Sequence, residues 1–227
     1  MRTAVRIINI SLLILFVLGY VLLGVSLSPQ PLSATSPRRT EIPRIPNEEL
    51  DRIINMSRSF ENSDSTMMES LIADRCSSFA APSFIPKVVH FILFGNHFSL
   101  SGFAAVKSAQ KHIQPDRVFM HIRDFPSDNE LLKRAVEEFN VTVVPARNVQ
   151  EIFGYSVGVP AHRSDVLRME ILLLFGGIYM DLDVFALKSA DELLQHEFVV
   201  GKQQRFFIDG LCNCILMVQL IRISCNK

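Results

Sequence analysis

The sequence has little of several features that mark common protein classes. Acidic and basic side chains balance at 23 each, and a net charge of zero argues against a nucleic-acid partner held by bulk electrostatics. Four cysteines are too few for a small domain built on disulfides, and six scattered histidines lack the paired spacing of a zinc site. With 48% hydrophobic residues the chain is not disordered as a whole, and its length predicts one domain, or one domain plus an appendage.

Charge is also missing from a long stretch near the N-terminus. No charged residue lies between Ile7 and Pro37, and residues 7–25 are nearly all apolar. As a helix this segment would span roughly 28 Å, close to the thickness of a bilayer core. A cleaved signal peptide usually has a shorter apolar stretch and a better cleavage site, and a buried core helix is the third interpretation. We expect an uncleaved membrane anchor.

The flanking charges predict how this anchor is oriented. Arg2 and Arg6 precede it, and the next charges are Arg38 and Arg39. The positive-inside rule then puts residues 1–6 in the cytoplasm and the rest of the chain on the other side, the type II arrangement. Residues 26–84 are expected to form a flexible stem, rich in Ser, Pro and Thr over 26–46, with one or two short amphipathic helices within 47–75.

From residue 85 onward, short apolar runs alternate with amphipathic segments. Strands are expected at 87–94, 117–122, 141–144, 177–180 and 198–200, the third of them stopped by Pro145. Helices are expected at 102–113, 128–139 with Asp128 as its N-cap, 161–175, and 190–196. This alternation favours an α/β domain with a mostly parallel, doubly wound sheet.

The last part of the chain predicts an incomplete domain. Residues 211–218 have the pattern of another buried strand, and the sequence ends nine residues later without a closing helix. The domain predicted for residues 85–227 would therefore be truncated at its C-terminus, as in an alternative product of a longer gene.

One acidic pair stands where an α/β sheet binds ligands. Asp181 and Asp183 directly follow the strand expected at 177–180, and ligands of open α/β sheets bind at the carboxyl ends of strands. If extended, two carboxylates two residues apart point the same way, and their hard oxygens suit Mg²⁺ or Mn²⁺. The alternative is an acidic solvated loop without a metal.

The preceding helix carries a charged pair in an apolar context. Asp165 and Arg168 lie three residues apart on one helix face, and five consecutive apolar residues follow at 171–175. A surface ion pair is the simple interpretation, whereas charges on a helix buried by its neighbours usually have a partner or a function. Gly176 and Gly177 then allow a sharp turn into the strand, although a helix C-cap alone would explain one of them.

Two motifs carry a resemblance to a known family. The run from Ser164 to Val184 (SDVLRMEILLLFGGIYMDLDV) closely resembles the DXD sugar-binding region of family 32 glycosyltransferases, whose pattern is S-D-x-x-R, an apolar helix and G-G-[IV]-Y-x-D-x-D. Residues 85–92 (IPKVVHFI) are similar to the first nucleotide-binding strand of that family. The resemblance covers roughly residues 84–217 and fails after Asn213 and the few residues that follow it.

The resemblance implies a fold and an activity. The fold would be the GT-A type, a Rossmann-like α/β domain, in a Golgi membrane protein. The activity would be metal-dependent transfer of a sugar, with retention, from a UDP- or GDP-linked donor to a glycan or sphingolipid hydroxyl. The alternative is a catalytically inactive truncated product that binds the donor weakly or serves as a membrane-anchored partner.

The same resemblance implies roles for individual residues. Asp183 would ligate Mn²⁺ or Mg²⁺, and Asp181 would act on the ribose or through a metal-bound water, so these two are the candidate catalytic and metal-binding residues. Asp165 and Arg168 would bind hydroxyls of the donor sugar. The remaining donor-site residues would be Val89, His90 and Phe91 beside the nucleotide base, Tyr179 as support, and Gly177, which allows close approach of the chain.

Overall fold

The computed structural model describes residues 44–61, 63–78, 85–196, 198–200 and 217–219. The predicted cytoplasmic segment 1–6, the predicted anchor 7–25, the first part of the predicted stem and residues 201–216 lie outside these ranges. Within the described ranges, no helix is both long enough and apolar enough to cross a membrane. The anchor therefore stays a prediction of the sequence.

A six-stranded sheet forms the centre of the fold, in the order β3-β2-β1-β6-β8-β7. Four of its strands are parallel: β1 (Val88–Leu93), β2 (Arg117–Ile122), β3 (Val141–Pro145) and β6 (Ile178–Tyr179). The strand β8 (Met217–Gln219) is antiparallel to β6 and to β7 (Phe198–Val200), between which it lies. The predicted α/β class with a mostly parallel sheet is confirmed.

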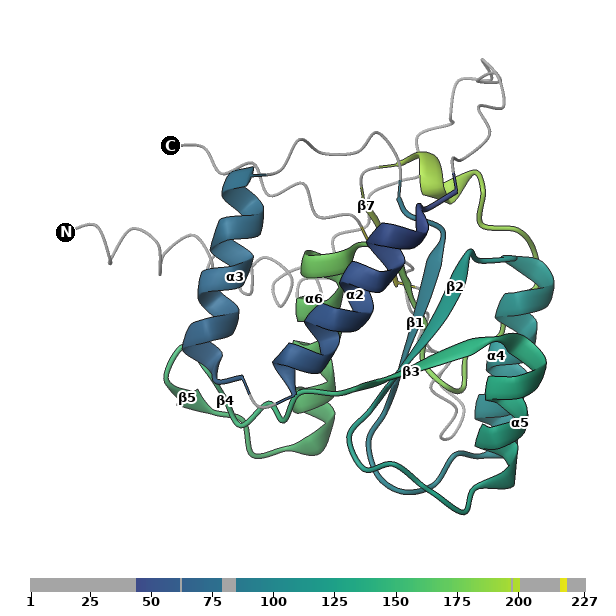
Figure 1. The fold of residues 1–227 in the computed structure, drawn as a ribbon, viewed down its shortest axis with the longest axis horizontal. Helices are drawn as coiled ribbons and strands as arrows, with labels where there is room; N and C mark the ends of the chain where they lie inside the picture. Colours follow the sequence, from purple (N-terminus) through teal and green to yellow (C-terminus); the bar gives the residue numbers. More distant parts are fainter. Residues whose placement is uncertain (1–43, 62, 79–84, 197, 201–216, 220–227) are drawn as a thin grey trace, which may run out of the picture. The chain divides into compact units, whose positions relative to one another are not determined.

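Helices cover both faces of this sheet (Figure 1). On one face lie α4 (Leu100–His112) and α5 (Glu130–Phe139), and on the other α2 (Asn47–Phe60) and α6 (Pro160–Phe175), with α3 (Ser65–Ser78) packed against α6. Successive side chains of β1 alternate between the two apolar cores, Val89 toward α4 and Val88 toward α6. Because both faces are covered, all six side chains of β1 are buried.

The boundaries of the elements agree closely with the sequence patterns, with three local differences. Asn129 rather than Asp128 caps α5, because its extended backbone lets its side chain accept the N–H of Leu132 at 3.0 Å. Strand β3 includes Pro145, which it tolerates because it is the edge strand of the sheet. The segment expected as a helix at 190–196 contains the short 3₁₀ helix η1 (Leu193–Gln195).

Two helices lie within the range for which a stem is expected. In α2, Leu50, Ile53 and Phe60 are buried, and their spacing of three and seven residues makes one apolar stripe. This stripe and Met68 of α3 pack in the same core as Phe175 of α6. The short helices expected within residues 47–75 are therefore present as α2 and α3, and they pack on the α/β body.

A small antiparallel hairpin interrupts the connection from β3 to α6. It consists of β4 (Glu151–Ile152) and β5 (Tyr155–Ser156), joined by Phe153 and Gly154, which both have positive φ. This hairpin could not be predicted from the sequence, because strands of two residues carry no periodic signal.

The two glycines between α6 and β6 have separate structural reasons. Gly176 ends the helix with φ 68° and ψ −165°, a combination that only glycine adopts readily. Gly177 has φ 99°, and a Cβ there would lie 2.6 Å from Cγ2 and 2.9 Å from the carbonyl oxygen of Val88. Position 176 thus needs glycine for its backbone angles. Position 177 needs glycine both for its positive φ and for its close approach to β1.

A pair of buried histidines links three elements beside this turn. His90 of β1 and His121 of β2 are 3.1 Å apart, between Nδ1 and Nε2, and Nε2 of His90 is 3.1 Å from the carbonyl oxygen of Gly176. Because that carbonyl can only accept, Nε2 of His90 carries the proton, and His121 donates to Nδ1 of His90. Burial lowers the pKa of His90 to about 3 and that of His121 well below its ordinary value, so both rings are neutral.

Substituting Gly177 by Ala tests the close approach of the chain to β1. The added Cβ would meet the Val88 backbone, which cannot move as a side chain does, and it would also strain a positive φ. We expect G177A to lower the free energy of unfolding by about 2–4 kcal/mol, measured by urea denaturation. The control is G158A, where a Cβ meets nothing within 4 Å. Equal loss in the two variants would contradict this account.

The histidine pair predicts a stability that depends on pH. The unfolded chain binds protons on these rings below about pH 6.5, whereas the folded chain does not, so stability should fall as pH drops from about 6.5 toward 3. The slope is about 1.4 kcal/mol per pH unit for each histidine. In urea unfolding between about pH 7 and pH 5, H121N should show a shallower slope than the wild type. The exposed control H97Q should keep the wild-type slope.

Candidate functional site

The connection of α6 to β6 brings the predicted site residues to one edge of the sheet. Only Gly176 and Gly177 separate the helix from the strand, so the chain reverses there. The start of α6, with Asp165 and Arg168, therefore returns to the edge where β6 ends at Asp181. Because β6 is parallel to β1, this is the carboxyl edge of the parallel strands, where α/β sheets bind ligands.

Four of the predicted residues contact one another at this edge. Nη2 of Arg168 lies 3.0 Å from Oδ1 of Asp165 and 3.6 Å from Oδ1 of Asp181. The hydroxyl of Tyr179 donates a hydrogen bond of 2.6 Å to the same oxygen of Asp181. The guanidinium carbon of Arg168 lies 4.7 Å from the centre of the Tyr179 ring, in cation–π contact.

One side of the cluster is held by the buried Tyr179, and the other side, at Asp165, is exposed to solvent. Asp165 has 59% of its side chain exposed, whereas Arg168 and Asp181 have 21% and 26%. Burial raises the pKa of the Tyr179 phenol far above its ordinary value; Arg168 opposes this and Asp181 adds to it. Tyr179 therefore stays protonated and acts as a fixed donor to Asp181. Nε of Arg168 is buried and has no hydrogen-bond partner among the described residues.

Asp183 lies in a turn rather than in an extended strand. The N–H of Val184 donates to the carbonyl oxygen of Asp181 at 3.1 Å, which closes the turn. The side chains of Asp181 and Asp183 therefore lack the common direction that an extended strand would give them. The side chain of Asp183 is exposed and that of Asp181 is partly exposed.

The chemistry of these two carboxylates fits a divalent cation. Mg²⁺ usually takes one or two carboxylates together with substrate phosphates rather than a cage of protein ligands. Across the described part of the chain, no group of three or more His, Cys, Asp and Glu is placed to hold a metal ion. The carboxylates of Asp181 and Asp183 are the groups at this edge that could hold such a cation together with substrate phosphates.

Four other predicted residues lie away from this cluster. The side chains of Val89 and Phe91 are fully buried in one core, and His90 is fully buried on the opposite face of β1. The backbone of His90 lies opposite Tyr179 in the register of β1 and β6, but the side chains of Val89, His90 and Phe91 point into the cores that cover the sheet. Gly177 lies before β6, at its other end, and approaches β1.

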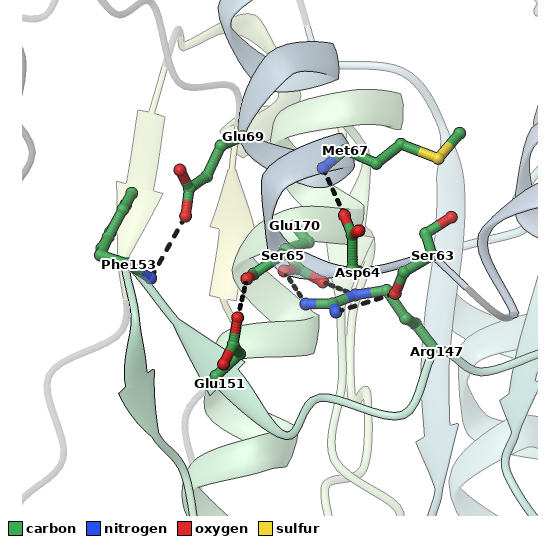
Figure 2. Close-up of polar contacts among 9 residues, drawn as sticks. All are labelled: Ser63, Asp64, Ser65, Met67, Glu69, Arg147, Glu151, Phe153 and Glu170. Carbon is green, nitrogen blue, oxygen red and sulfur yellow. Dashed lines mark hydrogen bonds and ion pairs between the residues drawn. The ribbon is translucent and has the colours of Figure 1, made fainter.

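A buried ion pair that was not predicted from the sequence joins Arg147 to α6. Nε and Nη2 of Arg147 bind the carboxylate of Glu170 in α6 at 3.1 and 2.5 Å, and Nη1 binds the carbonyl oxygen of Ser63 at 3.3 Å (Figure 2). Burial raises the pKa of Glu170, and Arg147 opposes this rise. The available signal was a glutamate directly before the apolar run 171–175, because a buried carboxylate needs a partner.

Comparison with known proteins identifies the class. Residues 103–200 match the family model described as "Glycosyltransferase sugar-binding region containing DXD motif", a range that includes Asp165, Arg168, Tyr179, Asp181 and Asp183. The chain therefore carries a glycosyltransferase sugar-binding region. This match agrees with the resemblance of residues 164–184 to the DXD region of family 32 glycosyltransferases.

A curated relative extends the match. The chain is 26% identical over 153 residues to "Glucan organizing enzyme 1" of Cryptococcus neoformans var. grubii serotype A, covering 60% of this chain and 40% of that protein. The chain thus matches less than half the length of this relative. A solved structure, "PaToxG Glycosyltransferase", aligns with a TM-score of 0.35 at 19% identity, over 61% of this chain and 55% of its own.

The parallel part of the sheet, with helices on both faces, fits the Rossmann-like GT-A arrangement that the resemblance implied.

Replacing Tyr179 by Phe tests the internal anchoring of the cluster. The change removes the hydrogen bond to Asp181 without changing the volume of the core much, and Asp181 then lacks its one fixed donor in the cluster. We expect a loss of about 1–2 kcal/mol in the free energy of unfolding, measured with urea. Tyr155, 77% exposed, gives the control Y155F, which should be neutral. A neutral Y179F would contradict the role assigned to this hydroxyl.

Proposed function

We propose that this protein is a metal-dependent, retaining hexosyltransferase. It would move a sugar from a UDP- or GDP-linked donor to a hydroxyl of a glycan or glycolipid, such as a sphingolipid. The observation that carries this proposal is the cluster of Asp165, Arg168, Tyr179 and Asp181 at the carboxyl edge of the sheet. The family match over the same residues supports it.

The charges of the cluster suit a donor with a diphosphate. Asp165, Asp181 and Asp183 carry three negative charges and Arg168 one positive charge, so the edge is anionic in sum. An anionic diphosphate would be repelled there unless a cation intervened, and the exposed carboxylates are hard oxygen ligands. Mn²⁺ or Mg²⁺, held by Asp183 and Asp181, would supply charge neutralisation for the leaving diphosphate.

The other residues of the cluster bind and orient the donor. Asp165 and the remaining N–H groups of Arg168 would hydrogen-bond sugar hydroxyls, one as acceptor and the other as donor. Arg168 is held by the Tyr179 ring and by two carboxylates, so little orientation is lost when the donor binds. Tyr179 fixes Asp181 by a proton that burial keeps on the phenol.

The proposed setting of the protein follows from the sequence. Residues 7–25 would anchor it in the Golgi membrane as a single-pass type II protein, with residues 1–6 in the cytoplasm and the α/β domain in the lumen. The acceptor would then be a glycan or lipid headgroup on the lumenal side.

Replacing Asp183 by Asn tests both metal and donor. The amide keeps the shape of the side chain but loses the negative charge, so we expect the metal concentration for half-maximal donor hydrolysis to rise at least about tenfold. The control E137Q removes an exposed carboxylate of α5, on the other face of the sheet, and should change nothing.

The melting temperatures of the wild type and of D183N should be measured with Mn²⁺ and a panel of UDP- and GDP-sugars. A ligand that binds only the folded state raises the melting temperature, so one donor class should stabilise the wild type and not D183N. A shift without turnover would favour the non-catalytic alternative. The absence of a shift and of turnover with every donor would contradict the proposed function.

A further inference from the structure

Three hydrogen bonds tie the helical hairpin α2–α3 to the segment that precedes α6. Arg147 donates to the carbonyl oxygen of Ser63, Ser65 donates to Oε1 of Glu151 at 2.7 Å, and the N–H of Phe153 donates to Oε1 of Glu69 at 3.2 Å. Figure 2 shows the three bonds along one side of the start of α3. Each joins residues more than 80 positions apart, and all three end within residues 147–153.

Apolar contacts hold the same hairpin against α6. The rings of Phe60 and Phe175 stack with centres 6.1 Å apart, one at the end of α2 and the other at the end of α6. Met68 of α3 and Leu167 of α6 belong to the same buried core. The hairpin therefore packs against α6 between Leu167 and Phe175 as well as against the segment before the helix.

The segment between β3 and α6 is in turn tied to the first turn of α6. The N–H of Val157 donates to the carbonyl oxygen of Gln150 at 2.7 Å, and Nε of Arg163 donates to the carbonyl oxygen of Val157 at 2.8 Å. Asp165 follows Arg163 by two residues. A continuous series of contacts thus leads from Ser65 and Glu69 to the start of the helix that carries the sugar-site residues.

Arg147 couples the two sides of α6. Its partner Glu170 is two positions from Arg168, and two residues of an α-helix are about 200° apart around the axis. Glu170 is therefore directed toward Arg147 while Arg168 is directed toward Tyr179 and Asp181. A rotation of α6 that separated Glu170 from Arg147 would also move Arg168 away from Asp181.

We propose that α2–α3 is a positioning element for the sugar site, with Arg147 and Glu170 as positioning residues for Asp165 and Arg168. This inference rests on the proposed function, because it gives the hairpin a role in how that site meets the donor sugar. A buried ion pair is a weak source of stability, since desolvation offsets its attraction. We assign the Arg147–Glu170 pair the role of fixing the orientation of α6 about its axis.

The first test removes the two peripheral bonds without creating a cavity in the core. The full chain with S65A/E69A loses the contacts to Glu151 and Phe153. We expect the KM for the nucleotide sugar to rise about 5- to 20-fold, while the inhibition constant of the nucleoside diphosphate without sugar stays the same. A loss of folded protein alone would change neither the KM nor the inhibition constant. A rise in the KM alone therefore reports a change in how the sugar is positioned. E138A, which removes an exposed ion pair of α5, is the control.

The second test replaces the buried pair by apolar side chains. R147M/E170M avoids an unpaired buried charge, and such exchanges often leave stability nearly unchanged. This variant should show the same split between nucleotide sugar and nucleoside diphosphate. Wild-type KM for the nucleotide sugar in both variants would overturn the proposal.

A third readout does not depend on activity. Amide hydrogen exchange over residues 161–168 should be faster in S65A/E69A than in the wild type, with no change in α5. If the wild type neither binds nor turns over any donor, the proposed function fails, and this exchange measurement still decides the positioning. Equal exchange in the wild type and the variant would overturn it.

Discussion

The contact of the Gly177 backbone with Val88 is the constraint on which the site depends. It lets β6 pair with β1 directly after the end of α6. The helix must then run back along the sheet, and its first turns come to the carboxyl edge. Residues 13 positions apart, Arg168 and Asp181, meet there as a result. The site is thus a consequence of a close backbone approach at the opposite end of the strand.

Three kinds of polar group surround this arrangement. The histidine pair is neutral and satisfied within itself and by one carbonyl, so it links β1, β2 and the glycine turn without carrying charge. The Arg147–Glu170 pair is charged and buried, and it links the N-terminal helices to α6. Of these three groups, the cluster at the carboxyl edge is the one that combines charge with exposure, which is what binding of a polar ligand requires.

The sequence was sufficient for features that local patterns determine. Apolar runs and the Gly and Pro residues that bound them predicted β1, β2 and α6 to within two residues. The motifs predicted that Asp165, Arg168 and Asp181 belong to one site. It was insufficient where the partner is distant. The stripe on α2 shows that the helix buries one face and does not show against what, and the position of β8 between β6 and β7 has no local signal. The motif at residues 85–92 identified the right strand, whereas the burial of its side chains depends on helices that cover both faces.

The packing of α2 and α3 also has a practical consequence for recombinant work on this protein. A fragment cut at residue 85, where the α/β pattern of the sequence starts, would leave bare the apolar surface formed by Leu167, Leu174 and Phe175. Exposed apolar area of this kind promotes aggregation. A recombinant fragment should therefore begin upstream of Asn47, so that α2 and α3 remain and cover this apolar surface of α6.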